Sequence, residues 1–168
     1  MPLRSSAMRR IIKNRQIIED YWQHLTDDGE LPANPVIVSL ARWKQQRSVL
    51  LERGEPVGVR LPNTINPAEL AEDLPKLAVV ALEFPKFADG RAYSQARLLR
   101  ERYGYRGEIR AVGDVLRDQV FFMARGGFDV FELREDRSLE DALEAFGEFS
   151  ESYQPAADQP LPLYRRGR

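Results

Sequence analysis

The sequence has 168 residues, a length that predicts one domain with short appendages. Its 25 Lys and Arg balance 26 Asp and Glu, so the net charge of -1 gives no support to a nucleic-acid or membrane partner. Cys is absent, which excludes disulfides, thiol nucleophiles and iron–sulfur or siroheme centres held by thiolates of this chain. A single His, His24, excludes a multi-histidine metal site.

The N-terminus begins with a short leader, expected over residues 1–8. Basic residues cluster in the first 15 positions, but no apolar signal-peptide core follows them. The longest apolar run, Leu77 to Leu82, is far shorter than the roughly 20 residues that span a bilayer. We therefore expect a cytoplasmic protein.

The domain is expected over residues 9–153, and its first part, 9–35, is a hairpin followed by a connector. Pairs of Ile on either side of a polar stretch predict a β-hairpin that turns at Asn14-Arg15, because Asn tolerates positive φ. The connector contains His24, which as a lone His is expected to be structural or exposed. Residues 154–168 contain Pro and a basic end and are predicted to be a tail.

From residue 36, short runs rich in Val, Ile and Phe alternate with helical patterns. The runs predict five strands, at 36–40, 57–61, 77–84, 108–113 and 129–133. Helices are predicted at 41–53, 66–76, 90–103, 115–126 and 138–153. Asn66 and Ser138 are expected N-caps, and Gly126-Gly127 is expected to end the helix before it.

This alternation predicts an α/β fold, a mostly parallel five-stranded sheet of β–α units with a small N-terminal β-hairpin. Two architectures fit: an open doubly wound sheet, and a partial (βα) barrel with its helices on one side. In both, ligands bind beyond the carboxyl ends of the strands. Five short loops at those ends are therefore the places to look for a site.

The loop before helix 90–103 is the longest of the five. Lys86 and Arg91 flank the start of that helix, where free N–H groups and the helix dipole favour an anion. The alternative is that Asp89 caps the helix with its own carboxylate and Gly90 permits the turn. Asp114 presents the same choice before helix 115–126.

Charge is unevenly distributed along the chain. Residues 91–117 are rich in Arg, whereas residues 129–151 are rich in Asp and Glu. The Arg-rich stretch is either a basic face for an anionic substrate or an acidic partner protein, with an acidic face elsewhere, or it is a solvated helix face with internal ion pairs. Arg110 stands apart because it lies in a predicted strand, where a buried guanidinium needs a partner.

Three blocks of the sequence carry a recognisable pattern. Residues 87–100 read FADGRAYSQARLLR, 110–119 read RAVGDVLRDQ, and 127–133 read GFDVFEL. The first fits F-x-D-G-R-x-Y-S-x-A-R-x-L-R, and together they resemble an uncharacterised bacterial family, domain of unknown function 934, over roughly residues 10–153. Members are encoded beside enzymes of assimilatory sulfate and sulfite reduction and are described as oxidoreductases.

The resemblance implies a role in that pathway, and the lack of Cys favours an accessory role. We expect a protein that docks on a sulfite or sulfonucleotide reductase, or binds a small oxyanion or sulfonucleotide. The alternative is a small α/β enzyme, an oxidoreductase with an anion site at the strand ends. No cofactor and no metal are predicted, the catalytic residues are unknown, and a homo-oligomer is compatible with the sequence.

The residues expected to contact a ligand or partner lie in the strand-end loops and on the Arg-rich helix face. Tyr93 is expected there as a hydrogen-bonding neighbour, with a place in the core as the alternative. The full set is Lys86, Asp89, Gly90, Arg91, Tyr93, Arg97, Gly113, Asp114, Arg117 and Arg134.

Overall fold

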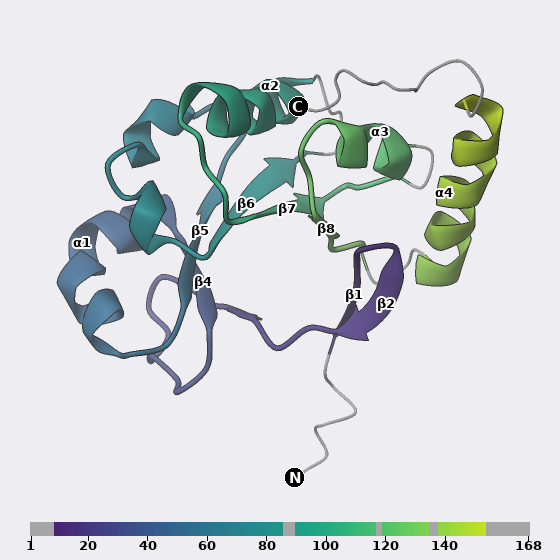
Figure 1. Ribbon diagram of the computed structural model, residues 1–168. Helices are drawn as coiled ribbons and strands as arrows, with labels where there is room; N and C mark the ends of the chain where they lie inside the picture. Colours follow the sequence, from purple (N-terminus) through teal and green to yellow (C-terminus); the bar gives the residue numbers. More distant parts are fainter. Residues whose placement is uncertain (1–8, 86–89, 117–118, 135–137, 154–168) are drawn as a thin grey trace, which may run out of the picture.

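Eight strands form one continuous sheet in the computed structural model, which describes residues 9–85, 90–116, 119–134 and 138–153 (Figure 1). Their order across the sheet is β2-β1-β8-β7-β6-β5-β4-β3. The bounds are β1 (Arg10–Lys13), β2 (Gln16–Glu19), β3 (Gln23–His24), β4 (Val36–Ser39), β5 (Val57–Leu61), β6 (Val79–Phe84), β7 (Glu108–Gly113) and β8 (Val130–Phe131).

The prediction of five strands is wrong in number, although all five are present as β4 to β8. They run parallel, and β3 extends the parallel part at one edge. The predicted hairpin is confirmed as β1 and β2, with φ values of 55 and 60 at Asn14 and Arg15. It joins the sheet because β1 pairs antiparallel with β8, a long-range contact that local periodicity does not reveal.

Four helices accompany the strands in the described ranges: α1 (Leu40–Glu52), α2 (Arg91–Arg97), α3 (Val120–Arg125) and α4 (Leu139–Tyr153). The predicted helix 66–76 is instead two 3₁₀ turns, Pro67–Leu70 and Leu74–Lys76. Pro75 explains the difference, because it lacks the N–H that a continuous helix would use. A π turn, Leu98–Arg102, continues α2, and α3 begins at Val120 rather than at 115.

The predicted caps at two helix starts are confirmed. The Asn66 side chain accepts a hydrogen bond from the backbone N of Ala68 at 2.9 Å. The Ser138 hydroxyl accepts one from the backbone N of Asp141 at 3.0 Å. Both side chains satisfy N–H groups that the first helical turn leaves unpaired.

The helices lie on one face of the sheet. Strands β3 to β8 follow one another in the sheet in chain order, so successive right-handed crossovers place their connections on the same side. The chain therefore has no point at which the strand order reverses, which a doubly wound sheet requires. The sheet is instead curled into a half-barrel with the helices outside (Figure 1).

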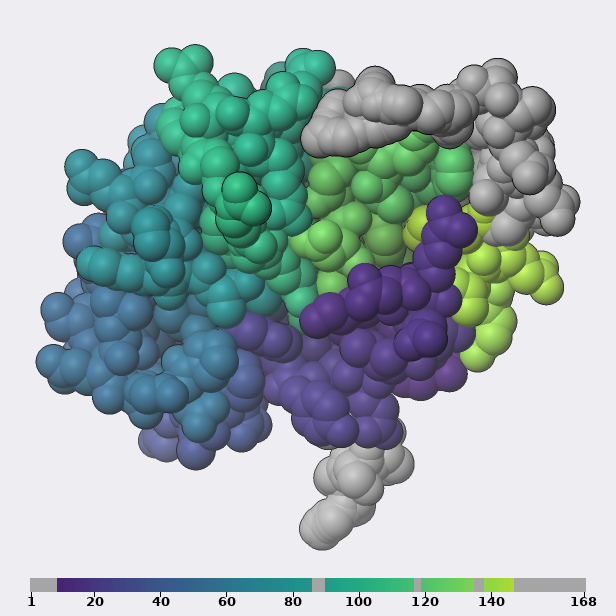
Figure 2. Space-filling view, viewed as in Figure 1, coloured from purple at the N-terminus to yellow at the C-terminus, as the bar shows by residue number. Residues whose placement is uncertain are grey.

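The curl also follows from the connection between the two edges of the sheet. Strands β2 and β3 lie at opposite edges, yet only residues 20–22 join them. Four residue steps reach about 14 Å at most, whereas a flat eight-stranded sheet is roughly 33 Å across. The two edges must therefore approach each other, and residues 20–22 cross the opening between them. In the space-filling view the first described residues, drawn in purple, lie between the α1 and α4 ends of the molecule (Figure 2).

The main hydrophobic core lies between the outer face of the sheet and the helices. It includes Trp43 of α1, Leu99 beside α2 and Phe146 of α4, all buried. A smaller cluster on the inner face consists of Ile37, Val79, Ala81 and Val112, with Trp22 packed against it. The inner face also carries several charged side chains, and the candidate site lies among them.

Candidate functional site

Charged side chains lie on the inner face of four neighbouring strands. Arg60 lies on β5, Glu83 on β6 and Arg110 on β7, each between apolar residues that belong to the outer core. Glu132, directly after β8, follows the same alternation. Because neighbouring side chains of a strand point to opposite faces, these four all point into the half-barrel.

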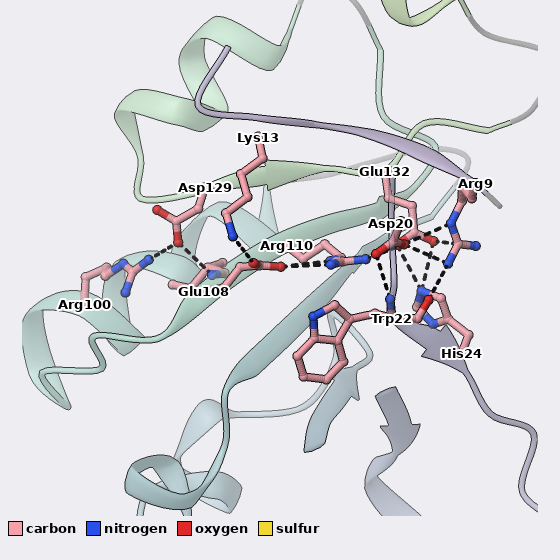
Figure 3. A network of polar contacts seen from close by, with 11 residues as sticks. Arg9, Lys13, Asp20, Trp22, His24, Arg100, Glu108, Arg110, Asp129 and Glu132 are labelled. Carbon is pink, nitrogen blue, oxygen red and sulfur yellow. Dashed lines mark hydrogen bonds and ion pairs between the residues drawn. The ribbon is translucent and has the colours of Figure 1, made fainter. Parts of the chain in front are cut away.

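Arg110 lies at the centre of this polar face (Figure 3). Its side chain is 1% exposed, and its Nη1 donates to Asp20 at 2.8 Å and to Glu132 at 3.1 Å. Its Nη2 lies 3.0 Å from a Glu108 oxygen. The prediction that this guanidinium needs a partner is confirmed, since three carboxylates surround it.

Asp20 is brought into the interior by the segment that crosses the opening. Its carboxylate is fully buried and accepts from Arg9 Nε at 3.1 Å, in addition to Arg110. It also accepts from the backbone N of Trp22 at 3.1 Å. These contacts hold residues 20–22 against the inner face of the sheet.

The charges of this interior cluster balance. Asp20, Glu108 and Glu132 face Arg9, Lys13 and Arg110, which are all in salt-bridge contact with at least one of them. Burial by itself would lower the pKa of Arg110, but the charge of Asp20, its hydrogen bond and the charges of Glu108 and Glu132 outweigh it and raise the pKa. The guanidinium is therefore charged at any pH at which the fold persists.

Glu132 also contacts His24, which lies on β3 at the far edge of the sheet. The His24 Nε2 lies 2.9 Å from one oxygen of Glu132 and 3.0 Å from the other. Burial opposes ionisation of Glu132, but the hydrogen bond from His24 and the guanidiniums of Arg9 and Arg110 lower its pKa to about 2. Glu132 is therefore a carboxylate in the neutral range.

The contacts continue beyond His24 to the next two strands. Arg60 Nη1 lies 3.2 Å from His24 Nδ1, and Arg60 Nε lies 3.2 Å from a Glu83 oxygen. Glu132, His24, Arg60 and Glu83 thus form a chain of polar contacts from β8 to β6. Arg60 and Glu83, at 26% and 38% side-chain exposure, are the more accessible members.

A cavity of about 430 Å³ opens beside this chain of contacts. Its lining consists of Arg9, His24, Arg60, Glu83, Phe84, Pro85, Val112, Gly113 and Glu132. Phe84 and Gly113 are the last residues of β6 and β7, so the cavity lies at the carboxyl ends of the parallel strands. Ligands of closed (βα) barrels and of open parallel sheets bind at this end of the strands.

A larger hollow, about 650 Å³, lies at the opposite, amino-terminal end of the strands. Its main cation, Arg100, donates to the backbone oxygens of Tyr105, Gly107 and Gly127 and pairs with Asp129 at 2.6 Å. These bonds tie the π turn to the start of β7 and β8. We assign this hollow a structural role, because its central guanidinium serves to satisfy backbone oxygens.

Three of the residues predicted from the strand-end loops lie at the same edge as the cavity. Gly113 lines it, and Asp114 and Arg134 form an ion pair of 2.9 Å just beyond. Asp114 does not cap α3, because that helix begins at Val120 and its N-cap is Gln119.

The predicted site residues in and before α2 that the structure describes do not line the cavity. Gly90 precedes the helix with a φ of 90, which supports its predicted role in the turn. Tyr93 packs edge-on against Phe84 at 5.5 Å, and burial raises its pKa, so it has the core position given as the alternative. Arg91 and Arg97 are exposed. Lys86, Asp89 and Arg117 lie outside the described residues.

The inner polar residues were not among the predicted site residues. Four of them, Arg60, Glu83, Arg110 and Glu132, are marked in the sequence, because each is a charged residue between two apolar neighbours. His24 and Asp20 carry no such pattern, since they reach the interior through the curl of the sheet and the short crossing segment.

The described part of the chain contains no group of three or more His, Asp or Glu residues placed to hold a metal ion. Among the helices in the same ranges, none combines the length and apolar character needed to cross a bilayer. The donors of the cavity are guanidinium and imidazole nitrogens, which suit an anion rather than a cation.

Comparison with known proteins identifies the family of this chain. The model of a bacterial protein family of unknown function, DUF934, matches residues 58–164, well over half of the chain. A search of curated proteins gives no match. The matched range includes Arg60, Glu83, Arg110 and Glu132, and it begins after His24. The chain therefore belongs to the bacterial family DUF934.

Proposed function

We propose that this protein binds a small oxyanion at the carboxyl ends of its parallel strands, as an accessory protein of assimilatory sulfate and sulfite reduction. The observation that carries the proposal is the cavity of about 430 Å³ with Arg9, Arg60 and His24 in its lining. An oxyanion offers several acceptor oxygens, which match the N–H groups of a guanidinium.

Arg60 is the group best placed to take the ligand. Arg9 donates to Asp20 and pairs with Glu132, and these contacts hold the crossing segment. Among the residues that the structure describes, Arg60 forms one ion pair, with the partly exposed Glu83, and that carboxylate can turn to solvent. Exchange of Glu83 for an oxyanion leaves every buried charge of the interior cluster paired.

The link to sulfur rests on the family resemblance of the three sequence blocks. The absence of Cys supports an accessory role, because the chain has no thiolates for an iron–sulfur cluster. An accessory protein can deliver or sense the oxyanion, or hold the reductase that consumes it.

Thermal unfolding in the presence of anions tests the binding function. A ligand at 100 times its dissociation constant adds about 2.7 kcal/mol to the unfolding free energy. For a chain of this size the midpoint then rises by about 5–10 °C. We expect this rise with sulfite or sulfate, and no rise with chloride at equal ionic strength. Equal midpoints in all three salts would contradict the proposal.

Gene deletion tests the pathway. An accessory role at sulfite reduction predicts that the deletion strain grows on cysteine but grows poorly on sulfate and on sulfite. Normal growth on sulfite alone would place the protein before that step, and normal growth on sulfate would contradict the pathway assignment. Co-purification with the reductase at low salt, lost at high salt, would identify a docking contact.

A further inference from the structure

The two nitrogens of His24 have different partners, and these fix its protonation. A guanidinium has N–H groups only and cannot accept, so Arg60 Nη1 donates to Nδ1 of His24 at 3.2 Å. Nδ1 therefore carries a lone pair. Nε2 then carries the proton, which it donates to Glu132 at 2.9–3.0 Å. In this arrangement the imidazole is neutral.

The neutral imidazole leaves the cavity without net charge. The charged groups that face His24 come from four parts of the fold: Glu132 after β8, Arg60 on β5, Glu83 on β6 and Arg9 before β1. Arg110 of β7 contacts Glu132 on the side away from His24 (Figure 3), and the negative charge of Asp20 compensates its positive charge. Two guanidiniums therefore face two carboxylates. When a doubly charged oxyanion such as sulfate takes the place of Glu83 beside Arg60, one negative charge in the cavity remains uncompensated.

We infer that binding of an oxyanion in this cavity takes up one proton at Nδ1 of His24. Protonation turns Nδ1 from an acceptor into a donor, so the imidazole and Arg60 no longer bond to each other. An anion between them accepts from both. The Nε2 contact with Glu132 persists as a salt bridge, and the added positive charge balances the ligand.

The inference rests on the proposed function and adds to it the uptake of one proton when the oxyanion binds. Its consequence is a pH-dependent affinity, since a ligand that binds together with one proton binds more tightly as the pH falls. An imidazole changes its charge between about pH 5 and pH 8. Above that range we expect the affinity to fall about tenfold for each pH unit.

Sulfate is the appropriate probe, because it stays fully ionised across this range and cannot bring the proton itself. Calorimetric titration of sulfate at pH 7.5, in two buffers of different ionisation enthalpy, measures the protons taken up on binding. We expect about one proton for each bound anion.

His24 is the single His of the sequence, so its ring can be observed without assignment in untagged protein. In the ¹⁵N spectrum of the imidazole we expect one protonated and one unprotonated nitrogen in the free protein. Saturating sulfate at pH 7 should convert the second nitrogen to the protonated form.

The variant His24→Gln provides the control. A glutamine amide can donate to Glu132 while its oxygen accepts from Arg60, so it imitates the neutral imidazole without its titration. We expect sulfate to bind this variant with the same affinity at pH 6 and pH 8.

Two results would overturn the inference. Wild-type protein that binds sulfate equally well at pH 6 and pH 8, without proton uptake, would contradict the inference and leave the proposed function standing. Failure of sulfate to bind at pH 6 would contradict it as well, and stabilisation by sulfite in the thermal assay would then decide whether the proposed function survives.

Discussion

At the scale of single residues, the stability of the fold depends on the buried charge of Arg110. Its replacement by methionine, Arg110→Met, leaves the fully buried Asp20 carboxylate without its closest partner. Breaking a buried pair in this way costs about 3–5 kcal/mol. We expect a loss of that size in the unfolding free energy, measured by urea denaturation.

An exposed arginine provides the matched control for this substitution. Arg97→Met changes the same residue type on the surface of α2 and is expected to cost less than about 0.5 kcal/mol. In an Asp20→Asn background the cost of Arg110→Met should fall, because the carboxylate is gone. Equal losses for Arg97→Met and Arg110→Met would contradict a buried, paired Arg110.

Glu132 makes the stability of the fold depend on pH. Burial opposes its ionisation, but His24, Arg9 and Arg110 lower its pKa from the ordinary 4.5 to about 2. The unfolded chain therefore binds this proton at a higher pH than the folded chain does. The stabilisation of the fold by ionised Glu132 is complete above about pH 4.5 and is lost as the pH falls toward 2. The unfolding free energy changes by about 3 kcal/mol over this range.

Urea denaturation at about pH 5.5 and about pH 3 measures this effect. The wild-type protein should lose more unfolding free energy between these conditions than Glu132→Gln, which has no carboxylate to titrate. Parallel losses in the two proteins would show that Glu132 has an ordinary pKa in the folded state.

Glu83 competes with the proposed ligand for Arg60. Its removal in Glu83→Gln should raise the affinity for sulfate about two- to fivefold, the range expected for a partly exposed ion pair. Glu69→Gln removes a carboxylate from another surface pair, with Lys44, and should leave the affinity unchanged. Weaker binding to Glu83→Gln would assign Glu83 to the ligand rather than to Arg60.

At the scale of elements, the end of β7 depends on Gly113. Its φ is +97, and a Cβ there would lie 2.5 Å from the backbone oxygen of Phe84. Gly113→Ala therefore combines backbone strain with a clash between β6 and β7 and should cost about 2 kcal/mol or more. Gly54→Ala has a φ of +82 with no atom within 4 Å, and should cost about 1 kcal/mol.

Thermal or urea unfolding of these two variants checks the prediction. Gly113→Ala should also weaken sulfate binding, because Gly113 lines the cavity, whereas Gly54→Ala should not. Identical losses of stability would indicate that the clash with Phe84 relaxes without cost.

The elements that could be predicted from the sequence are those with a local pattern. The apolar runs of β4 to β8, the hairpin turn at Asn14-Arg15 and the cap at Asn66 are all in place. The two-residue strand β3 was missed, because it is defined by its pairing with β4 and has too few residues for periodicity. The apolar stripe over 66–76 predicted one continuous helix, although Pro75 divides the segment into two 3₁₀ turns.

At the scale of the whole molecule, the site is a product of curvature. The rule that ligands bind at strand ends led to Gly113, which lines the cavity. The partners of Arg60 could not be deduced from spacing, because His24 lies on β3 and meets Glu132 only when the sheet curls. The three-residue link between β2 and β3 is the sequence feature that requires this curl.

The position of the oxyanion inside the half-barrel is the central claim, and one titration tests it. Calorimetric titration of sulfite into wild-type protein, Arg60→Gln and Arg97→Gln compares the interior guanidinium with the surface one. We predict saturable binding of about one anion to the wild type and to Arg97→Gln, and affinity at least about tenfold weaker for Arg60→Gln, the loss expected for a charged hydrogen bond. Equal affinities in all three proteins, or a loss confined to Arg97→Gln, would contradict the interior site.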